Sequence, residues 1–269
     1  MTALLCPISF RRTRGRLRFW EVRRMLNLKV LVCATILAIG MGILGVAPLQ
    51  AQSVDDIVAK YVEALGGENV LSRIRSIYLE GTTQVMGNDN PTISYLVVGK
   101  GLRVDSEFNG SKFVNCFTPQ GGWMINPMAG GNAERIPGEE VKSSQENLQI
   151  GGYLFNYVDK GNKVELIGRD GSGGSTAYRL KITPKEGMET DYYIDAVTYH
   201  LIRAVHKGQM LGQDVEVTET FSDYRKTDIG YVIAYSKEVD FGGNFSTATT
   251  YRKVEINKAI DPAIFDMPK

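Results

Sequence analysis

Cysteine is scarce in this chain of 269 residues. It occurs three times, as Cys6, Cys33 and Cys116, and only Cys116 lies beyond residue 51, where we place the end of an export signal. The processed chain therefore cannot form an intramolecular disulfide, and its stability must come from an apolar core. Because Cys116 stands in a strand-like run, 112–117, we expect a buried, unreactive thiol.

Histidine is rarer still, with His200 and His206 as the only two. Six residues apart on one strand, they would lie roughly 20 Å from each other, which is too far to share a metal ion. The sequence contains no H-E-x-x-H and no G-x-S-x-G pattern, and the glycine-rich stretch 171–174 lacks the lysine of a phosphate loop. We therefore expect no catalytic residues, no metal site and no cofactor.

Runs of basic residues are missing beyond residue 51. Eight of the 31 basic residues lie before that point, against one acid, Glu21. The remainder holds 23 basic and 29 acidic residues, a net charge of −6. An acidic domain without a basic patch argues against binding to nucleic acid.

The first 51 residues have the order of an export signal. Seven arginines and Lys29 precede an apolar run, 30–46, that ends in a short segment closing on Ala51. A small residue before the scissile bond suits a signal peptidase, so we place cleavage between Ala51 and Gln52. Met25 is an alternative translation start, and an uncleaved membrane anchor is the alternative fate, because the run approaches the roughly 20 apolar residues that span a bilayer.

An amphipathic helix is expected directly after the signal, from Ser53 to Leu65. Its apolar residues recur at helical spacing on one face, and we take four of them as a lid face: Ile57, Val58, Tyr61 and Leu65. Ser53 with Asp56 can cap its start, and the two glycines after Leu65 can end it. A second short helix, with Val70, Leu71 and Ile74 inward, is expected before the first strand.

From residue 76 to about residue 257 the dominant apolar period is two, with turn residues between the segments. This pattern predicts a mainly β (α+β) domain over residues 52–269, built on one antiparallel meander of about nine to eleven strands. A sheet this long must curl, so we expect an unclosed barrel. We expect the irregular stretch 119–157, with a helix over 139–153, to supply one or two helices that cover the concave face.

Aromatic and aliphatic residues are plentiful on the expected strands. Most would form the core, but an apolar concave face is also a container for acyl chains, since about 0.8 kcal/mol is gained for each buried CH₂ group. We predict the following lining residues for such a ligand site: Ile93, Tyr95, Val97, Phe113, Trp123, Phe155, Tyr178, Leu180, Tyr199 and Leu201.

Several motifs in order resemble the outer-membrane lipoprotein-sorting family (LolA/LolB-like), of which this chain looks like a divergent member. They are the exported leader, the helix ending in Gly66 and Gly67, and the segments 195–203, 221–224, 228–235 and 260–268. The resemblance implies a periplasmic half-barrel that binds lipid or lipoprotein acyl chains without catalysis. Carriers of this family close their lid with an arginine, for which Arg73, Arg75 and Arg103 are candidates.

Three functions follow as hypotheses. The first is a monomeric periplasmic carrier or chaperone for lipoprotein acyl chains or lipid. The second is an envelope-stress sensor of the RseB type, which would bind an inner- or outer-membrane protein partner. The third is a hydrolase with its site in the 119–157 insertion, for which Glu139 and Glu140 are the candidate carboxylate pair.

Overall fold

The structure is a computed structural model that describes residues 52–171, 176–210, 213–243 and 245–269. The chain divides into the units 1–51 and 52–269, and only the second is described. The expected signal segment and Ala51 at its end lie outside the described residues. Within the described part, no helix has the length and apolarity needed to cross a membrane.

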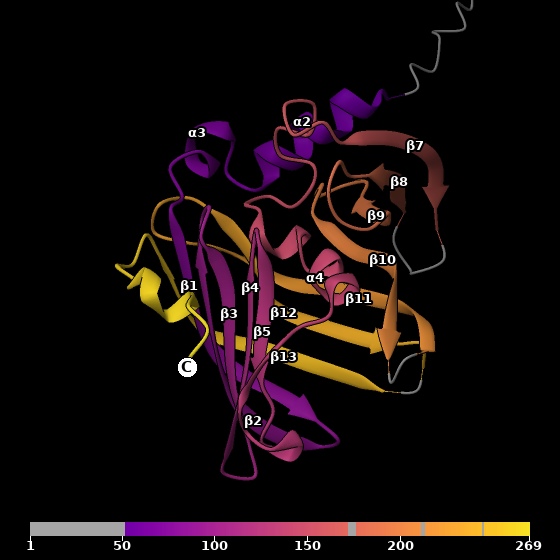
Figure 1. Ribbon diagram of the computed structural model, residues 1–269. Helices are drawn as coiled ribbons and strands as arrows, with labels where there is room; N and C mark the ends of the chain where they lie inside the picture. Colours follow the sequence, from indigo (N-terminus) through magenta and orange to yellow (C-terminus); the bar gives the residue numbers. More distant parts are fainter. Residues whose placement is uncertain (1–51, 172–175, 211–212, 244) are drawn as a thin grey trace, which may run out of the picture. The chain divides into compact units, whose positions relative to one another are not determined.

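Thirteen strands form one sheet in which every neighbouring pair is antiparallel (Figure 1). The strands are β1 (Ser76–Val85), β2 (Asn88–Val97), β3 (Gly101–Phe108), β4 (Ser111–Thr118), β5 (Gly121–Ile125), β6 (Ala133–Arg135), β7 (Lys163–Asp170), β8 (Ala177–Thr183), β9 (Thr190–Asp195), β10 (Leu201–Met210), β11 (Gln213–Lys226), β12 (Val232–Phe241) and β13 (Ser246–Ile256). The prediction of a single antiparallel sheet is confirmed.

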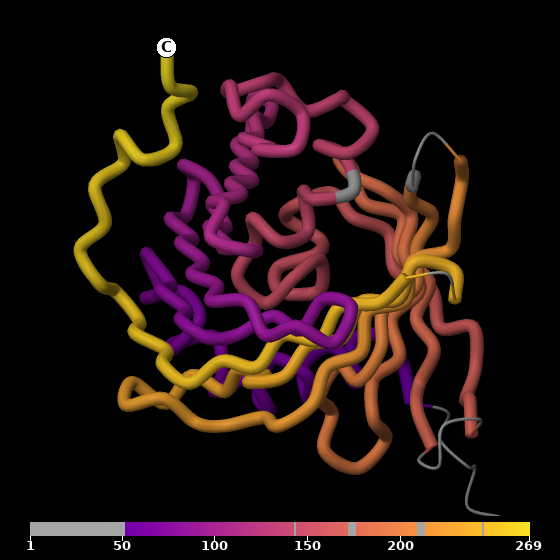
Figure 2. Tube along the Cα trace, turned by 90° about the horizontal axis from the view of Figure 1, so that it is seen from below, coloured from indigo at the N-terminus to yellow at the C-terminus, as the bar shows by residue number. Residues whose placement is uncertain are grey.

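The strand order is that of a meander wound almost into a circle. The first strand in the chain, β1, pairs with the last, β13. The ring of strands is open only between β6 and β7, which are the two edge strands of the sheet. The sheet is therefore an unclosed barrel, as expected. It curls so that β3 and β4 face β11 and β12 across its concave side (Figures 1 and 2).

Two short strands explain why the count exceeds the expected nine to eleven. Strand β6 has three residues, which is too few to show an alternation. Strand β9 has only six residues, and five of them are buried, so burial does not alternate along it. The hairpin after β1 turns at Met86 and Gly87, both with positive φ, and β2 includes Asn90 and Pro91.

Helix α2 (Val54–Ala64) begins with the expected capping box, in which the Ser53 hydroxyl accepts from the Asp56 N–H at 3.1 Å. Helix α3 (Glu68–Leu71) follows after a sharp turn. Gly66 is needed in that turn, because its φ is +115° and a Cβ there would lie 2.5 Å from the carbonyl oxygen of Gly230. The two helices lie over one end of the curled sheet (Figure 1).

The covering segment, residues 136–162, joins the two sheet edges and crosses the concave side. It contains α4 (Gly138–Ser143) and the 3₁₀ turn η2 (Glu146–Leu148), so the helix expected over 139–153 is shorter than predicted. Helix α4 contacts both β5 and β10. The turns after η2 lie inside the ring of strands (Figure 2). They contribute Tyr153 and Leu154, at most 1% exposed, to the main core.

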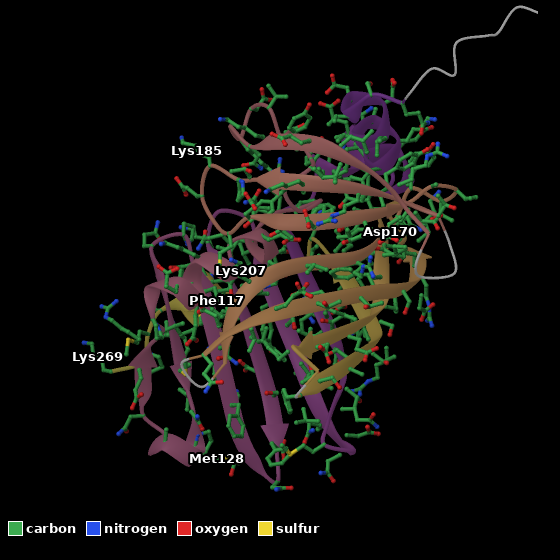
Figure 3. All side chains as sticks on the ribbon, turned by 90° about the vertical axis from the view of Figure 1, so that its right-hand side faces the viewer. Phe117, Met128, Asp170, Lys185, Lys207 and Lys269 are labelled. Carbon is green, nitrogen blue, oxygen red and sulfur yellow. The ribbon has the colours of Figure 1, made fainter. Side chains whose placement is uncertain are left out.

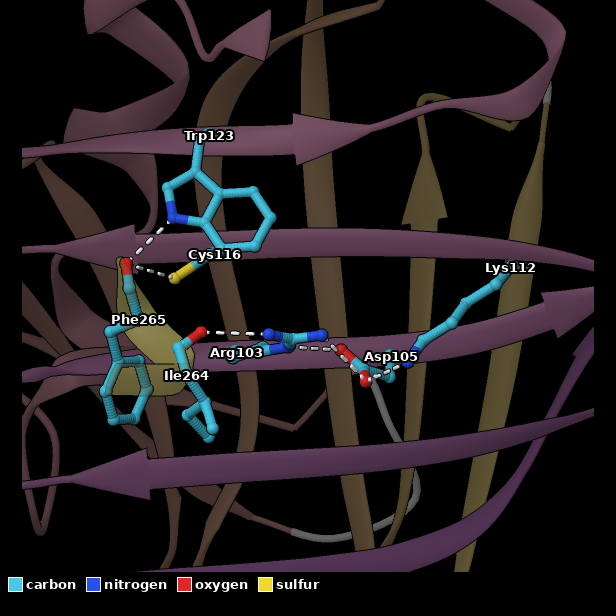
Figure 4. Close-up of polar contacts among 7 residues, drawn as sticks. All are labelled: Arg103, Asp105, Lys112, Cys116, Trp123, Ile264 and Phe265. Carbon is cyan, nitrogen blue, oxygen red and sulfur yellow. Dashed lines mark hydrogen bonds and ion pairs between the residues drawn. The ribbon is translucent and has the colours of Figure 1, made fainter. Parts of the chain in front are cut away.

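A second apolar cluster lies on the outer face of the sheet. It joins Val114, Cys116 and Trp123 to Phe265 of the C-terminal 3₁₀ turn η3 (Pro262–Phe265). The Phe265 carbonyl oxygen accepts from Trp123 Nε1 at 2.8 Å and from Cys116 Sγ at 3.6 Å (Figure 4). Cys116 is fully buried, as predicted, and burial raises the pKa of its thiol to about 12.

Candidate functional site

The concave side of the sheet holds an apolar cavity of about 380 Å³ beneath α2 and the covering segment, which we call the upper chamber. Its volume lies within the range of small-molecule binding sites. Tyr61 and Leu65 of α2 and Ile150 of the covering segment form its roof. The sheet supplies its apolar walls, among them Ile77, Leu79, Leu96, Leu102, Phe117, Leu201, Phe221 and Ile233.

A second cavity of about 680 Å³, the lower chamber, continues along the same concave side. Its lining mixes hydroxyl and amide groups, such as Thr92 and Asn115, with Phe108, Phe113 and Phe245. Met128, which is 75% exposed, lies on its rim. Figure 3 shows Met128 at the end of the domain opposite α2. The hollow therefore extends from the helix-covered end toward an open, apolar rim.

Four residues line both chambers: Ser94, Val104, Lys237 and Tyr251. We call this set the waist. It carries the one cation common to both linings. An ionised lysine in the lining of an apolar cavity needs an anionic partner. Removing a charge from water costs far more free energy than burying an apolar group gains.

Glu219 on β11 is that partner, with its Oε2 2.9 Å from Nζ of Lys237. The two side chains are 12% and 23% exposed. Burial by itself lowers the pKa of Lys237, but attraction to Glu219 outweighs burial and leaves this pKa above its usual value. Lys237 is therefore charged at neutral pH.

Glu146 links the covering segment to the sheet. Its carboxylate accepts a hydrogen bond from the hydroxyl of Tyr192 on β9, which is fully buried. Burial, and then repulsion by Glu219, raises the pKa of Glu146 to about 7. The bond that holds η2 over the upper chamber therefore involves a carboxyl group that changes charge near neutral pH.

We expect this titration to appear in the stability of the domain. An unfolded glutamate titrates near pH 4.3, whereas folded Glu146 titrates near 7. Between these values the folded state holds a proton that the unfolded state lacks. The free energy of unfolding should therefore fall as pH rises, by on the order of 1 kcal/mol per pH unit. Urea unfolding at several pH values should give a more negative slope of this free energy against pH in the wild type than in Glu146→Gln.

His206 and His200 contribute with the opposite sign, because burial lowers the pKa of each and their stabilising effect is lost as pH falls. Their contributions cancel when the two proteins are compared, since both proteins contain them. Glu139→Gln is a matched control, because the Glu139 side chain is 60% exposed. Equal pH slopes in the wild type and in Glu146→Gln would contradict the expectation.

Four of the residues predicted from sequence do line the chambers. Tyr61, Leu65 and Leu201 line the upper chamber, and Phe113 lines the lower one. Tyr61 also donates its hydroxyl hydrogen to the carbonyl oxygen of Gly151 at 3.2 Å, which ties α2 to the covering segment. Ligand binding by these residues stays a prediction.

Four other predicted lining residues lie on the opposite face of the sheet, which corrects their assignment. The chambers take Thr92, Ser94 and Leu96 from β2, so the alternate residues Ile93, Tyr95 and Val97 point outward. Tyr95, Val97 and Trp123 instead belong to the outer cluster under the C-terminal segment. These residues do not face the cavity. They are apolar because the C-terminal segment covers them.

The remaining predicted residues serve the main core. Ile57, Val58, Tyr178 and Leu180 are at most 7% exposed within it, and Phe155, also in the core, sits in the covering segment and not on a strand.

Tyr199 lies in the turn before β10, not on that strand, with φ of +58°. Its hydroxyl accepts from Gln52 and Lys60, so it anchors the start of the domain. His200 precedes β10 as well, so the two histidines do not share a strand as expected.

Two of the three candidate arginines have partners outside α2. Arg103 donates to the carbonyl oxygen of Ile264 at 2.9 Å and pairs with Asp105, so it holds the C-terminal segment (Figure 4). Arg75 donates to the carbonyl oxygens of Ser72 and Ile74 in its own turn. The carbonyl oxygen of Arg73 accepts from Asn257 Nδ2.

The carboxylate pair considered for a hydrolase lies on α4. Glu139 and Glu140 line a separate hollow of about 290 Å³, together with His206 and Glu219. Glu139 forms an exposed ion pair with Lys142 at 2.8 Å. Across the described ranges, no cluster of three or more His, Cys, Asp or Glu side chains is placed to hold a metal ion.

Glu146, Glu219 and Lys237 were missed as site residues. A signal for two of them exists in the sequence. Glu219 lies two residues from both Val217 and Phe221, and Lys237 precedes Val239 and Phe241 at the same spacing, so each shares a strand face with apolar residues. An ionisable residue in the apolar phase of a strand points to a buried charge. Glu146 carries no such signal, because it lies in an irregular segment.

Solved structures share this architecture. The structure assigned as an outer membrane lipoprotein-sorting protein domain from Vibrio parahaemolyticus matches with a TM-score of 0.50 and 14% identity, over 78% of this chain and 97% of that one. The LolA superfamily protein NE2245 from Nitrosomonas europaea matches with a TM-score of 0.53 and 10% identity, over 80% and 98%. The chain has a LolA/LolB-like fold.

A DUF1329 family protein from Desulfovibrio piger shares the LolA/LolB-like fold with this chain, with a TM-score of 0.53 and 19% identity over 80% of this chain and 98% of that one. No protein-family model and no curated protein sequence matches the chain. The likeness therefore concerns the fold and by itself assigns no function.

Proposed function

We propose that this protein is a non-enzymatic periplasmic carrier or chaperone that binds lipid or lipoprotein acyl chains in the two chambers. The observation that carries the proposal is the apolar hollow on the concave side, roofed by α2 and the covering segment. A LolA/LolB-like fold supports the same function by analogy.

The energetics favour an acyl chain as the occupant. Each buried CH₂ group contributes about 0.8 kcal/mol, so six to eight methylenes in the upper chamber give about 5–6 kcal/mol before the cost of association is subtracted. The walls of that chamber come mainly from Leu, Ile, Phe and Tyr side chains. A hydrophobic chain thus gains its affinity without any reactive group.

Export to the periplasm is part of the proposal. It rests on the basic and apolar order of residues 1–51, with cleavage between Ala51 and Gln52. A carrier between membranes would work as a monomer and exchange its cargo with inner- or outer-membrane proteins. Such partners are expected at the open rim near Met128, where the lower chamber meets solvent.

Native mass spectrometry of the protein purified from periplasm tests the proposal. We expect a monomer of the processed chain that carries adducts of lipid mass, and displacement of those adducts by fluorescent fatty-acyl probes. A protein that emerges without adducts and binds no acyl probe would refute the carrier function. A co-purifying membrane protein without bound lipid would favour the sensor instead.

A further inference from the structure

The waist places a charged amine between two apolar chambers. Lys237 lines both, and its ammonium group has three N–H donors. Within the described residues, Glu219 is the acceptor placed against this ammonium, and the ring of Phe221 lies 5.6 Å away. One carboxylate cannot satisfy all three donors from one side.

A ligand that fills the waist displaces the water that can solvate the remaining donors. A pure hydrocarbon would leave them without an acceptor, which is costly in an apolar cavity. A ligand with a carboxylate or carbonyl oxygen at that point would supply the acceptor. The neighbouring Tyr251 adds a neutral hydroxyl to the same wall, because burial raises its pKa.

The geometry points to an acyl ligand whose carboxylate or ester carbonyl oxygen accepts a hydrogen bond from Lys237 at the waist, with apolar groups extending into the chambers. This inference rests on the proposed function and names the ligand class more closely. It also identifies Lys237 as the residue that selects acyl compounds over plain hydrocarbons.

Glu219 tunes the choice between acid and ester. In the wild type it neutralises Lys237 and its own charge repels an ionised carboxylate at the same place, so the pair favours a neutral carbonyl. Replacing Glu219 by Gln leaves the ammonium uncompensated, and a buried cation then favours an anionic partner. Glu219→Gln should therefore bind the fatty acid more tightly, by about tenfold, and change ester binding less.

Three matched probes test the inference: a pyrene-labelled fatty acid, its methyl ester and the corresponding pyrene-labelled alkane. The main variant is the double substitution Glu219→Gln with Lys237→Met, which removes both charges and leaves no buried ion unpaired. We expect it to weaken acid and ester binding about tenfold, equal to about 1.4 kcal/mol, and to leave alkane binding unchanged. Lys112→Met, which removes an ion-paired lysine on the outer face, is the control and should change nothing.

The outcomes distinguish the role of Lys237 from the carrier function. Loss of acid and ester affinity with retained alkane affinity supports the role of Lys237. If the double variant loses affinity equally for all three probes, or for none of them, the role of Lys237 is overturned. Binding of the probes by the wild type would still uphold the carrier function. Failure of the wild type to bind any probe overturns both. Thermal unfolding of each variant shows whether the fold is kept.

Discussion

Val104→Trp should abolish most acyl binding while the domain stays folded. Val104 belongs to the waist, so an indole at this position projects into the space that the two chambers share. If it excludes about four methylenes, the loss is about 3 kcal/mol, on the order of 100-fold in affinity. Titration with a fluorescent fatty-acyl probe measures it. Because the side chain enters a cavity and not a packed core, the cost to stability should stay small.

The matched control for this substitution is Val197→Trp. Val197 is 85% exposed in the turn before β10, so the same change of side chain there adds no bulk to either chamber. It should bind the probe as the wild type does. Unchanged affinity in a folded Val104→Trp would show that acyl probes bind elsewhere, and the chambers would lose their assigned function.

Phe265→Ala should release the C-terminal segment from the outer face of the sheet. Phe265 is 5% exposed, and its ring lies against Gly101, where an added Cβ would come within 3.0 Å of it. Truncating a buried Phe costs about 3–5 kcal/mol. The segment should therefore detach under conditions in which the sheet stays folded.

Cys116 reports on that detachment directly. Burial raises the pKa of its thiol to about 12, and the thiolate is the reactive form. Once the segment leaves, this pKa should return toward its usual value, so a thiol reagent should label Phe265→Ala far faster than the wild type at mildly alkaline pH. Met267→Ala, two residues later and 38% exposed in the wild type, should label slowly. Equal labelling rates in all three proteins would contradict the assigned contact.

The helices and the meander were predictable because their signals are local. In α2 the apolar spacing and the Ser53–Asp56 capping box act within one or two turns of chain. The hairpins likewise follow from alternation and turn residues. Prediction failed where the alternation was absent or misplaced, as in β6 with its three residues and in the turn at Tyr199.

The face that each strand presents to the cavity could not be decided in the same way. A period of two shows that alternate residues share a face, but a shift of one residue exchanges the faces. In β2 both faces are apolar at one end, since Leu96 belongs to the main core and Tyr95 and Val97 pack against the outer cluster. The sequence signal was therefore ambiguous, and the covering by a distant segment resolved it.

By itself the sequence determined a buried Cys116, the amphipathic helix α2 and a curled antiparallel sheet, because each depends on residues close together in the chain. Only the tertiary structure decided that Lys237 and Glu219 meet at the waist and that Glu146 reaches Tyr192, 46 residues away. The reason is physical: a cavity and its buried charges are created by the curl of the sheet and the path of the covering segment, which bring together side chains that no local pattern relates.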